Sequence, residues 1–128
     1  MKKVKGFTLI ELVVVIVILG ILAVISVPAY VNLRTTAQEN ALRASLGTMR
    51  AAIALQHSEN LLAGSDTYPA AIAASMFETG IPTDPINSTA AVATSAADPI
   101  VVTATTGGWI YNATTGEVRC NHTSYSTY

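Results

Sequence analysis

The stretch KGFTLIELVVVIVILGILAVISVPAY, residues 5–30, decides how the rest of this 128-residue chain is interpreted. Between residues 7 and 27 the only charged residue is Glu11, and after it the only polar one is Ser26. A helix over this segment is roughly 32 Å long at about 1.5 Å per residue, which matches the roughly 30 Å hydrocarbon core of a bilayer. The sequence therefore predicts a transmembrane helix over residues 7–29.

The flanks of this segment favour a retained anchor over a secretory signal peptide. A secretory apolar region is usually about 7–15 residues long and ends at a small-residue cleavage site, whereas this run continues through VPAY into a second helical pattern. Three of the seven basic residues, Lys2, Lys3 and Lys5, precede the run. The positive-inside rule then keeps the N-terminus in the cytoplasm and exports the residues after 30.

Glu11 needs an explanation of its own. A carboxylate at the centre of a transmembrane helix costs roughly 2.5–3.5 kcal/mol on insertion scales, and such residues usually have a partner. A glutamate near the membrane interface of a plain anchor is the simplest alternative. A partner charge from a neighbouring molecule is the other.

The same stretch resembles the class III signal of type IV pilins and type II secretion pseudopilins. The resemblance rests on the basic leader, the Gly6–Phe7 junction, Glu11 and the helix-bending proline Pro28. It implies that a prepilin peptidase cuts after Gly6, removes the leader 1–6, and methylates the new amino terminus at Phe7. It also implies that Glu11 meets the amino terminus of a neighbouring subunit during assembly, because a buried charge is tolerated chiefly when it is paired.

Beyond residue 30 an amphipathic pattern continues the helix. Leu42, Leu46, Met49 and Ile53 follow spacings of four, three and four, which place them on one helical face. Asn60 to Ser65, with Gly64, has the composition of a helix end. The sequence therefore predicts one helix over residues 7–62, whose part 30–62 covers a soluble core.

The rest of the chain predicts a small sheet. Three β-like runs, at residues 100–104, 109–112 and 117–121, are separated by the Gly-containing turns TTGG and ATTG, which suit antiparallel hairpins. Residues 88–99 are expected to form a surface loop, and residues 70–77 a short helix. The fold class is α+β and pilin-like: one long N-terminal helix and an antiparallel three-stranded sheet, within residues 63–128, packed on its C-terminal half.

No enzyme is expected. His57 and His122 have no metal-ligand spacing with another His or Cys, and no phosphate loop or nucleophile–base motif occurs. No cofactor is predicted, and calcium bound by Asp84 or Asp98 is the weaker alternative. Cys120 is the only cysteine, so it forms no intramolecular disulfide; it is expected to be a small apolar residue on a strand, with an intermolecular bond as the alternative.

Three functions remain open. The segments IPTDPINS and GGWIYNATTGEVRCN resemble the distal part of pseudopilins, which favours a subunit of a short filament that drives protein export. The alternatives are a type IV pilin for adhesion, motility or DNA uptake, and a membrane-anchored binding domain that never polymerises. For both filament types the resemblance implies other pilin-like subunits, the prepilin peptidase and an inner-membrane assembly platform as partners. The net charge of −1 gives no indication of a nucleic-acid partner. The expected location is the bacterial inner membrane, with the C-terminal part in the periplasm or in an extracellular filament.

Overall fold

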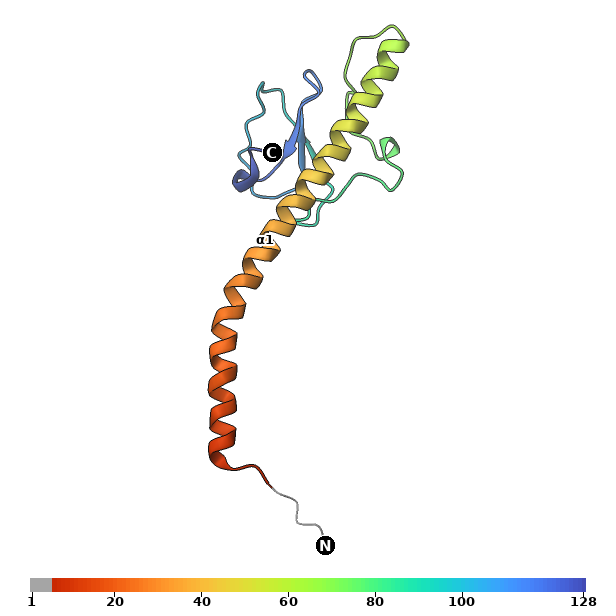
Figure 1. The fold of residues 1–128 in the computed structure, drawn as a ribbon. Helices are drawn as coiled ribbons and strands as arrows, with labels where there is room; N and C mark the ends of the chain where they lie inside the picture. Colours follow the sequence, from red (N-terminus) through yellow and green to blue (C-terminus); the bar gives the residue numbers. More distant parts are fainter. Residues whose placement is uncertain (1–5) are drawn as a thin grey trace. The chain divides into compact units, whose positions relative to one another are not determined.

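The computed structural model describes residues 6–128, apart from the side chains of residues 28 and 29. The chain divides into two compact units, Met1–Ala37 and Gln38–Tyr128. One helix, α1 (Leu9–Leu62), runs through both, and the remaining elements belong to the second unit (Figure 1). They are η1 (Ala74–Met76), β1 (Val92–Thr94), β2 (Trp109–Tyr111), β3 (Val118–Cys120) and η2 (Thr123–Tyr125).

Helix α1 ends where the sequence predicts. The N–H of Gly64 donates to the carbonyl of Leu61 (3.0 Å), and the N–H of Ser65 donates to the carbonyl of Asn60 (2.9 Å). Gly64 has φ +86°, the left-handed conformation that glycine adopts at little cost. These two bonds form a Schellman motif, which satisfies carbonyls that the helix itself leaves unpaired.

The predicted stripe on α1 forms the core of the second unit. Leu42, Leu46, Met49 and Ile53 are at most 2% exposed. They pack against the buried side chains of Ile72, Trp109, Tyr111, Val118 and Cys120. In Figure 1 the blue strands lie beside the yellow turns of α1. The helix covers one face of the sheet, so the predicted α+β architecture is confirmed.

The hairpin formed by β2 and β3 is also confirmed. The two strands pair antiparallel, with Trp109 opposite Cys120 and Tyr111 opposite Val118. All four of these side chains are buried, as expected for one face of a strand pair with a period of two. Ile110 and Arg119, opposite each other on the other face, are half-buried.

The prediction of the first strand is wrong. Residues 100–104 form no strand; β1 lies instead within residues 88–99, which were expected to be a loop, and it pairs parallel to β2. The sheet is therefore mixed, with the order β1-β2-β3. Parallel neighbours need a crossover connection of roughly a dozen residues or more. Residues 95–108 supply that crossover, and the N–H of Ile100 donates to the Glu117 carboxylate (2.9 Å) rather than to a strand.

The predicted helix over residues 70–77 is reduced to the short 3₁₀ turn η1. Ile72 is buried between the exposed Ala71 and Ala73, and this alternation belongs to an extended segment. Burial of the Ile72 side chain in the core therefore prevails over the helix propensity of the alanines on either side.

Candidate processing and assembly site

The first turn of α1 is closed by a reciprocal pair of hydrogen bonds between Thr8 and Glu11. The backbone N–H of Thr8 donates to Oε2 of Glu11 (2.8 Å), and the N–H of Glu11 donates to Oγ1 of Thr8 (3.3 Å). The Thr8 hydroxyl also donates to the same carboxylate oxygen (2.9 Å). This arrangement is a capping box, in which two N–H groups that the helix leaves unpaired are satisfied.

Sequence reasoning missed Thr8. The signal was present, because Thr8-Leu9-Ile10-Glu11 fits the S/T-x-x-E pattern that precedes an apolar run. Within one subunit, Glu11 therefore already has a hydrogen-bonding partner. That partner is neutral, so within one subunit these bonds bring no opposite charge to the carboxylate.

The surroundings of Glu11 are apolar and open. Phe7, Ile10, Val14 and Val15 line a hollow of about 330 Å³ together with the carboxylate-bearing side chain. Phe7 is 88% exposed.

Gly6 lies outside α1 and is exposed, with open space where a side chain would project. The peptide bond that follows it is therefore sterically accessible to a peptidase. The leader residues 1–5, including the predicted lysine cluster, lie outside the described residues. Pro28 is inside α1, but its side chain is likewise outside the described part, so its role in assembly stays a prediction.

The apolar surface of the first unit has no covering partner within the described chain. The large apolar side chains between Phe7 and Val27 are all exposed, by 38% or more. Burying one such side chain is worth about 1.5–3 kcal/mol, so leaving the whole segment in water costs on the order of tens of kcal/mol. By length and composition α1 is able to cross a membrane, and none of its most apolar window is buried.

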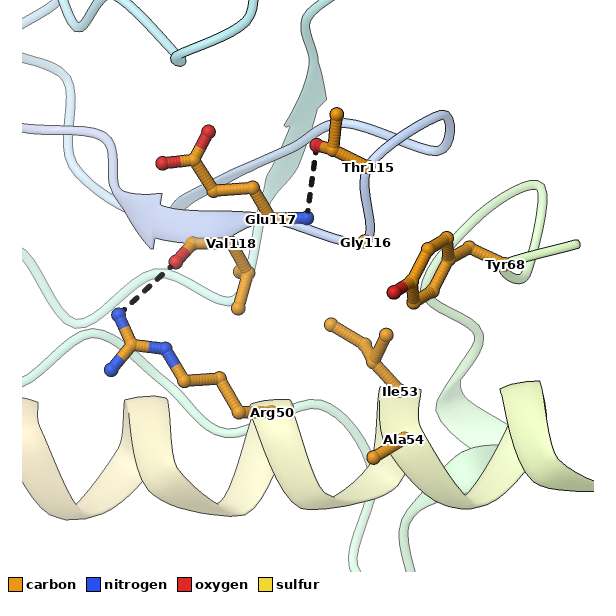
Figure 2. Close-up of a pocket in the computed structure, with 8 residues that line it drawn as sticks. All are labelled: Arg50, Ile53, Ala54, Tyr68, Thr115, Gly116, Glu117 and Val118. Carbon is orange, nitrogen blue, oxygen red and sulfur yellow. Dashed lines mark hydrogen bonds between the residues drawn. The ribbon is translucent and has the colours of Figure 1, made fainter.

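The second unit has a separate groove of about 270 Å³ between α1 and the β2–β3 turn (Figure 2). Ile53 and Ala54 on α1 and Val118 on β3 form apolar walls on opposite sides of it, and the ring of Tyr68 lies beside Gly116. A side chain at Gly116 would overlap that ring, which explains the glycine.

The charged groups around this groove are engaged elsewhere. Arg50 reaches across to the carbonyl of Val118 (3.5 Å), while the Glu117 carboxylate points away from the groove (Figure 2). Burial raises the pKa of the Glu117 carboxyl. The hydrogen bonds from the Ile100 N–H and from Arg119, together with the positive charges of Arg119 and Arg50, lower it by more. The pKa of Glu117 therefore lies below its ordinary value. The lining contains no nucleophile–base pair.

Asp84 is the most deeply buried charge-bearing residue of the described chain, with no exposed surface. Its Oδ1 accepts from the N–H of Ile86 (2.9 Å), and its Oδ2 accepts from the N–H groups of Asn87 (3.3 Å) and Gly108 (3.1 Å). The carboxylate thus ties the loop that follows Pro82 to the turn before β2. A side chain at Gly107 would collide with Asn87 and with Oδ2 of Asp84.

The calcium alternative stays untested. The two carboxylate oxygens of Asp84 together accept hydrogen bonds from three backbone N–H groups. Asp98, the other predicted ligand, is exposed at the surface. Within residues 6–128 no three side chains of His, Cys, Asp or Glu come together as a set able to hold a metal ion.

The environment of Cys120 predicts an unreactive thiol. The residue is fully buried on β3, and burial, followed by the charge of Asp84, raises the pKa of the thiol to about 11. Since thiolate is the reactive species, alkylation by iodoacetamide at pH 8 should be at least about 100-fold slower in the native protein than in urea. Intact mass spectrometry of both samples measures this ratio, and equal rates would contradict the burial of Cys120.

Comparison with known proteins gives one family match and several relatives that align with part of the chain. Residues 1–27 match the family described as the prokaryotic N-terminal methylation motif. The type IV major fimbrial protein FimA of Dichelobacter nodosus is 49% identical over 49 residues, which are 38% of this chain and 31% of FimA. The type IV narrow pilus major component PilA5 of Thermus thermophilus is 47% identical over 53 residues, 41% of this chain and 46% of PilA5. The fimbrial protein EcpC of Eikenella corrodens is 39% identical over 72 residues, 56% of this chain and 47% of EcpC.

No solved structure matches at comparable significance. The matched segments span about a third to a half of the length of these relatives.

The family match covers the same N-terminal residues that contain Gly6, the Thr8–Glu11 capping box and the apolar part of α1. In the matched segments the chain is similar to type IV pilins, the family that the sequence resembles. The relatives are named as pilus and fimbrial proteins. None of these relatives is a pseudopilin, so that finer assignment stays a prediction.

Proposed function

We propose that this chain is a structural subunit of a helical filament, inserted in the inner membrane, trimmed after Gly6 and then assembled through the helix that begins at Leu9. The observation that carries the proposal is the exposed apolar segment between Phe7 and Val27, in which every large apolar side chain is at least 38% exposed. Such a segment is stable only in a lipid bilayer or against other apolar surfaces. A subunit that moves from membrane to filament keeps it covered in both places.

Charge placement supports the same proposal. The carboxylate of Glu11 is held at the start of α1 by Thr8, four residues after Phe7. Cleavage after Gly6 would create an ammonium at Phe7, and a monomethylated amine keeps that positive charge. In the filament, the ammonium of one subunit and Glu11 of the next would form an ion pair in a low-dielectric core, which sets the axial position of each subunit.

The type IV pilin assignment is favoured for the filament, because the N-terminal relatives are fimbrial and pilus components. The pseudopilin assignment is kept as the second candidate on one observation. The Gly-Trp-Ile-Tyr-Asn segment forms a buried strand and turn, with Trp109 and Tyr111 in the core, and this segment resembles the pseudopilin hairpin. Long surface filaments would support the first assignment, and short filaments that require a secretion machinery would support the second.

Intact mass spectrometry of the protein from its native membranes tests the processing step. Loss of MKKVKG with one added methyl group is expected. Electron microscopy of sheared filaments, with labelling by an antibody against the second unit, then tests assembly. An unprocessed chain in cells without labelled filaments would overturn the proposal and leave the anchored binding domain as the remaining candidate.

Replacing Gly6 with leucine is expected to block cleavage, because the peptidase must accommodate the residue at the position where the structure shows open space. The variant should accumulate at the mass of the uncut chain and enter no filaments. Gly47→Leu is the matched control, since Gly47 is also exposed with open space around it but lies far from the junction. Normal processing of Gly6→Leu would contradict the assigned cleavage site.

A further inference from the structure

A second groove on the second unit lies between α1 and the loop that follows η1, and we call it the helix–loop groove. It has a volume of about 390 Å³. Its lining is largely apolar and includes Ala51, Ala52, Leu55, Met76, Phe77 and Glu78. Leu55 is 63% exposed and lies one helical turn after Ala51 and Ala52. An engineered apolar cavity of about 150 Å³ holds benzene, so this groove has room for a large apolar side chain.

Glu78 gives the helix–loop groove an acidic edge. It is exposed, and within residues 6–128 its carboxylate has neither an ion-pair nor a hydrogen-bond partner. A smaller hollow of about 160 Å³ continues the groove past Leu55 to Glu59, a second acid. The helix–loop groove is therefore complementary to an apolar side chain that has a positive charge beside it.

Three of the four arginines in the described chain already have partners within the same chain. Arg43 donates to the Tyr128 hydroxyl (2.9 Å) and lies over its ring. Arg119 pairs with Glu117, and Arg50 reaches the carbonyl of Val118 beside the same acid. Arg34 is exposed and has no partner among residues 6–128. The three lysines belong to the leader whose removal is proposed above.

Arg34 is accompanied by the apolar side chains that the helix–loop groove requires. Tyr30 is 71% exposed and Leu33 is 69% exposed. Spacings of three and four along α1 place Tyr30, Leu33 and Arg34 on one helical face. We call these three residues the Tyr30 strip. An exposed apolar pair next to an unpaired cation is the chemical complement of an apolar groove next to an unpaired acid.

We propose that the Tyr30 strip of one copy of this chain docks into the helix–loop groove of another copy in the same filament, with Arg34 paired to Glu78. The inference rests on the proposed filament function and names the surfaces that join neighbouring subunits outside the apolar core. The strip and the groove are different surfaces of the same chain, so the contact is heterologous. A heterologous contact repeats from copy to copy and builds an open helix when its rotation does not close a ring.

Charge reversal tests the pairing in the full-length protein. Arg34→Glu and Glu78→Lys should each lower the filament-bound fraction of the protein by about tenfold or more, because each brings like charges together. The combined variant should recover to near the wild-type fraction. Asp98→Lys is the control, since Asp98 is an exposed acid away from the groove, and it should assemble normally. Single variants that assemble normally, or a combined variant that fails to recover, would overturn the proposal.

Cysteine cross-linking tests the contact directly. Arg34→Cys and Glu78→Cys variants, each with a different tag, are expressed together, so a disulfide between the tags can only join two copies. Cys120 does not interfere, because it is buried. Mixed-tag dimers in sheared filaments are expected. Their absence, or a cross-link from residue 78 to a different protein, would overturn the proposal.

These results separate this inference from the proposed function. If the wild-type chain is processed and forms filaments while the charge reversals have no effect, only the docking surface is wrong. If the wild-type chain stays unprocessed and forms no filaments, the proposed function itself fails, and the cross-link between copies has no basis.

Discussion

Cells that produce the Glu11→Ala variant are expected to insert and process the chain normally but to assemble almost no filaments. The variant loses a negative charge that the proposed filament core pairs with the amino terminus of the next subunit. Removing one partner of a buried ion pair costs about 3–5 kcal/mol, because the other charge is left buried and uncompensated. That cost lowers the affinity between subunits by at least about a hundredfold. The measurement is the ratio of the variant in sheared filaments to the variant in membranes.

The hydrogen bonds between Thr8 and Glu11 make a second variant necessary as a control. Glu11 also accepts the N–H and hydroxyl of Thr8, and losing that cap would cost about 0.5–2 kcal/mol of helix stability. Glu11→Gln keeps an acceptor for the capping box but removes the charge. If ion pairing drives assembly, Glu11→Gln fails as Glu11→Ala does. Normal filaments from Glu11→Gln would show that the cap alone is required.

The second large effect is expected at Asp84, and it concerns folding. Asp84→Ala removes the acceptor of three backbone N–H groups in a site with no exposed surface. Hydrogen bonds to a charged group contribute about 1.5–3 kcal/mol each, and unsatisfied buried donors add a penalty. We expect a loss of about 3–5 kcal/mol in the free energy of unfolding of the second unit, a large share of the roughly 5–15 kcal/mol that holds a typical domain together.

Urea denaturation of the full chain in detergent, followed by the fluorescence of Trp109, measures this loss. Trp109 is the only tryptophan and is fully buried beside the affected turn, so its emission reports on the second unit. Asp98→Ala is the control, because Asp98 is exposed, and it should change the midpoint little. An Asp84→Ala midpoint within error of the wild type would contradict the structural role assigned to these three bonds.

The candidate site was predictable from the sequence where its signals are local. Gly6, Phe7 and Glu11 follow one another within a single short motif, and the spacing alone points to processing and to a charge in an apolar segment. Thr8 was equally readable in the S/T-x-x-E pattern. The helix–loop groove was not predictable, because its walls, α1 and the loop that carries Glu78, come together only in the folded chain.

The sequence by itself determined the elements whose patterns are local. The period of Leu42, Leu46, Met49 and Ile53 and the glycine at the helix end specify α1 and its buried face, and the alternation around Trp109 specifies the β2–β3 hairpin. In each case residues close in the chain carry the whole signal.

Only the tertiary structure decided which segment pairs with β2 as its parallel strand, and that the Asp84 side chain is buried. Both residues 92–94 and residues 100–104 contain β-branched residues that favour a strand. In the folded chain residues 92–94 pair with the free edge of β2. Residues 100–104 belong to the connection between β1 and β2, where Ile100 is buried. Burial of Asp84 likewise follows from the meeting of its loop with the turn before β2. Such contacts join residues distant in sequence, so the free energy that selects them has no local pattern to reveal it.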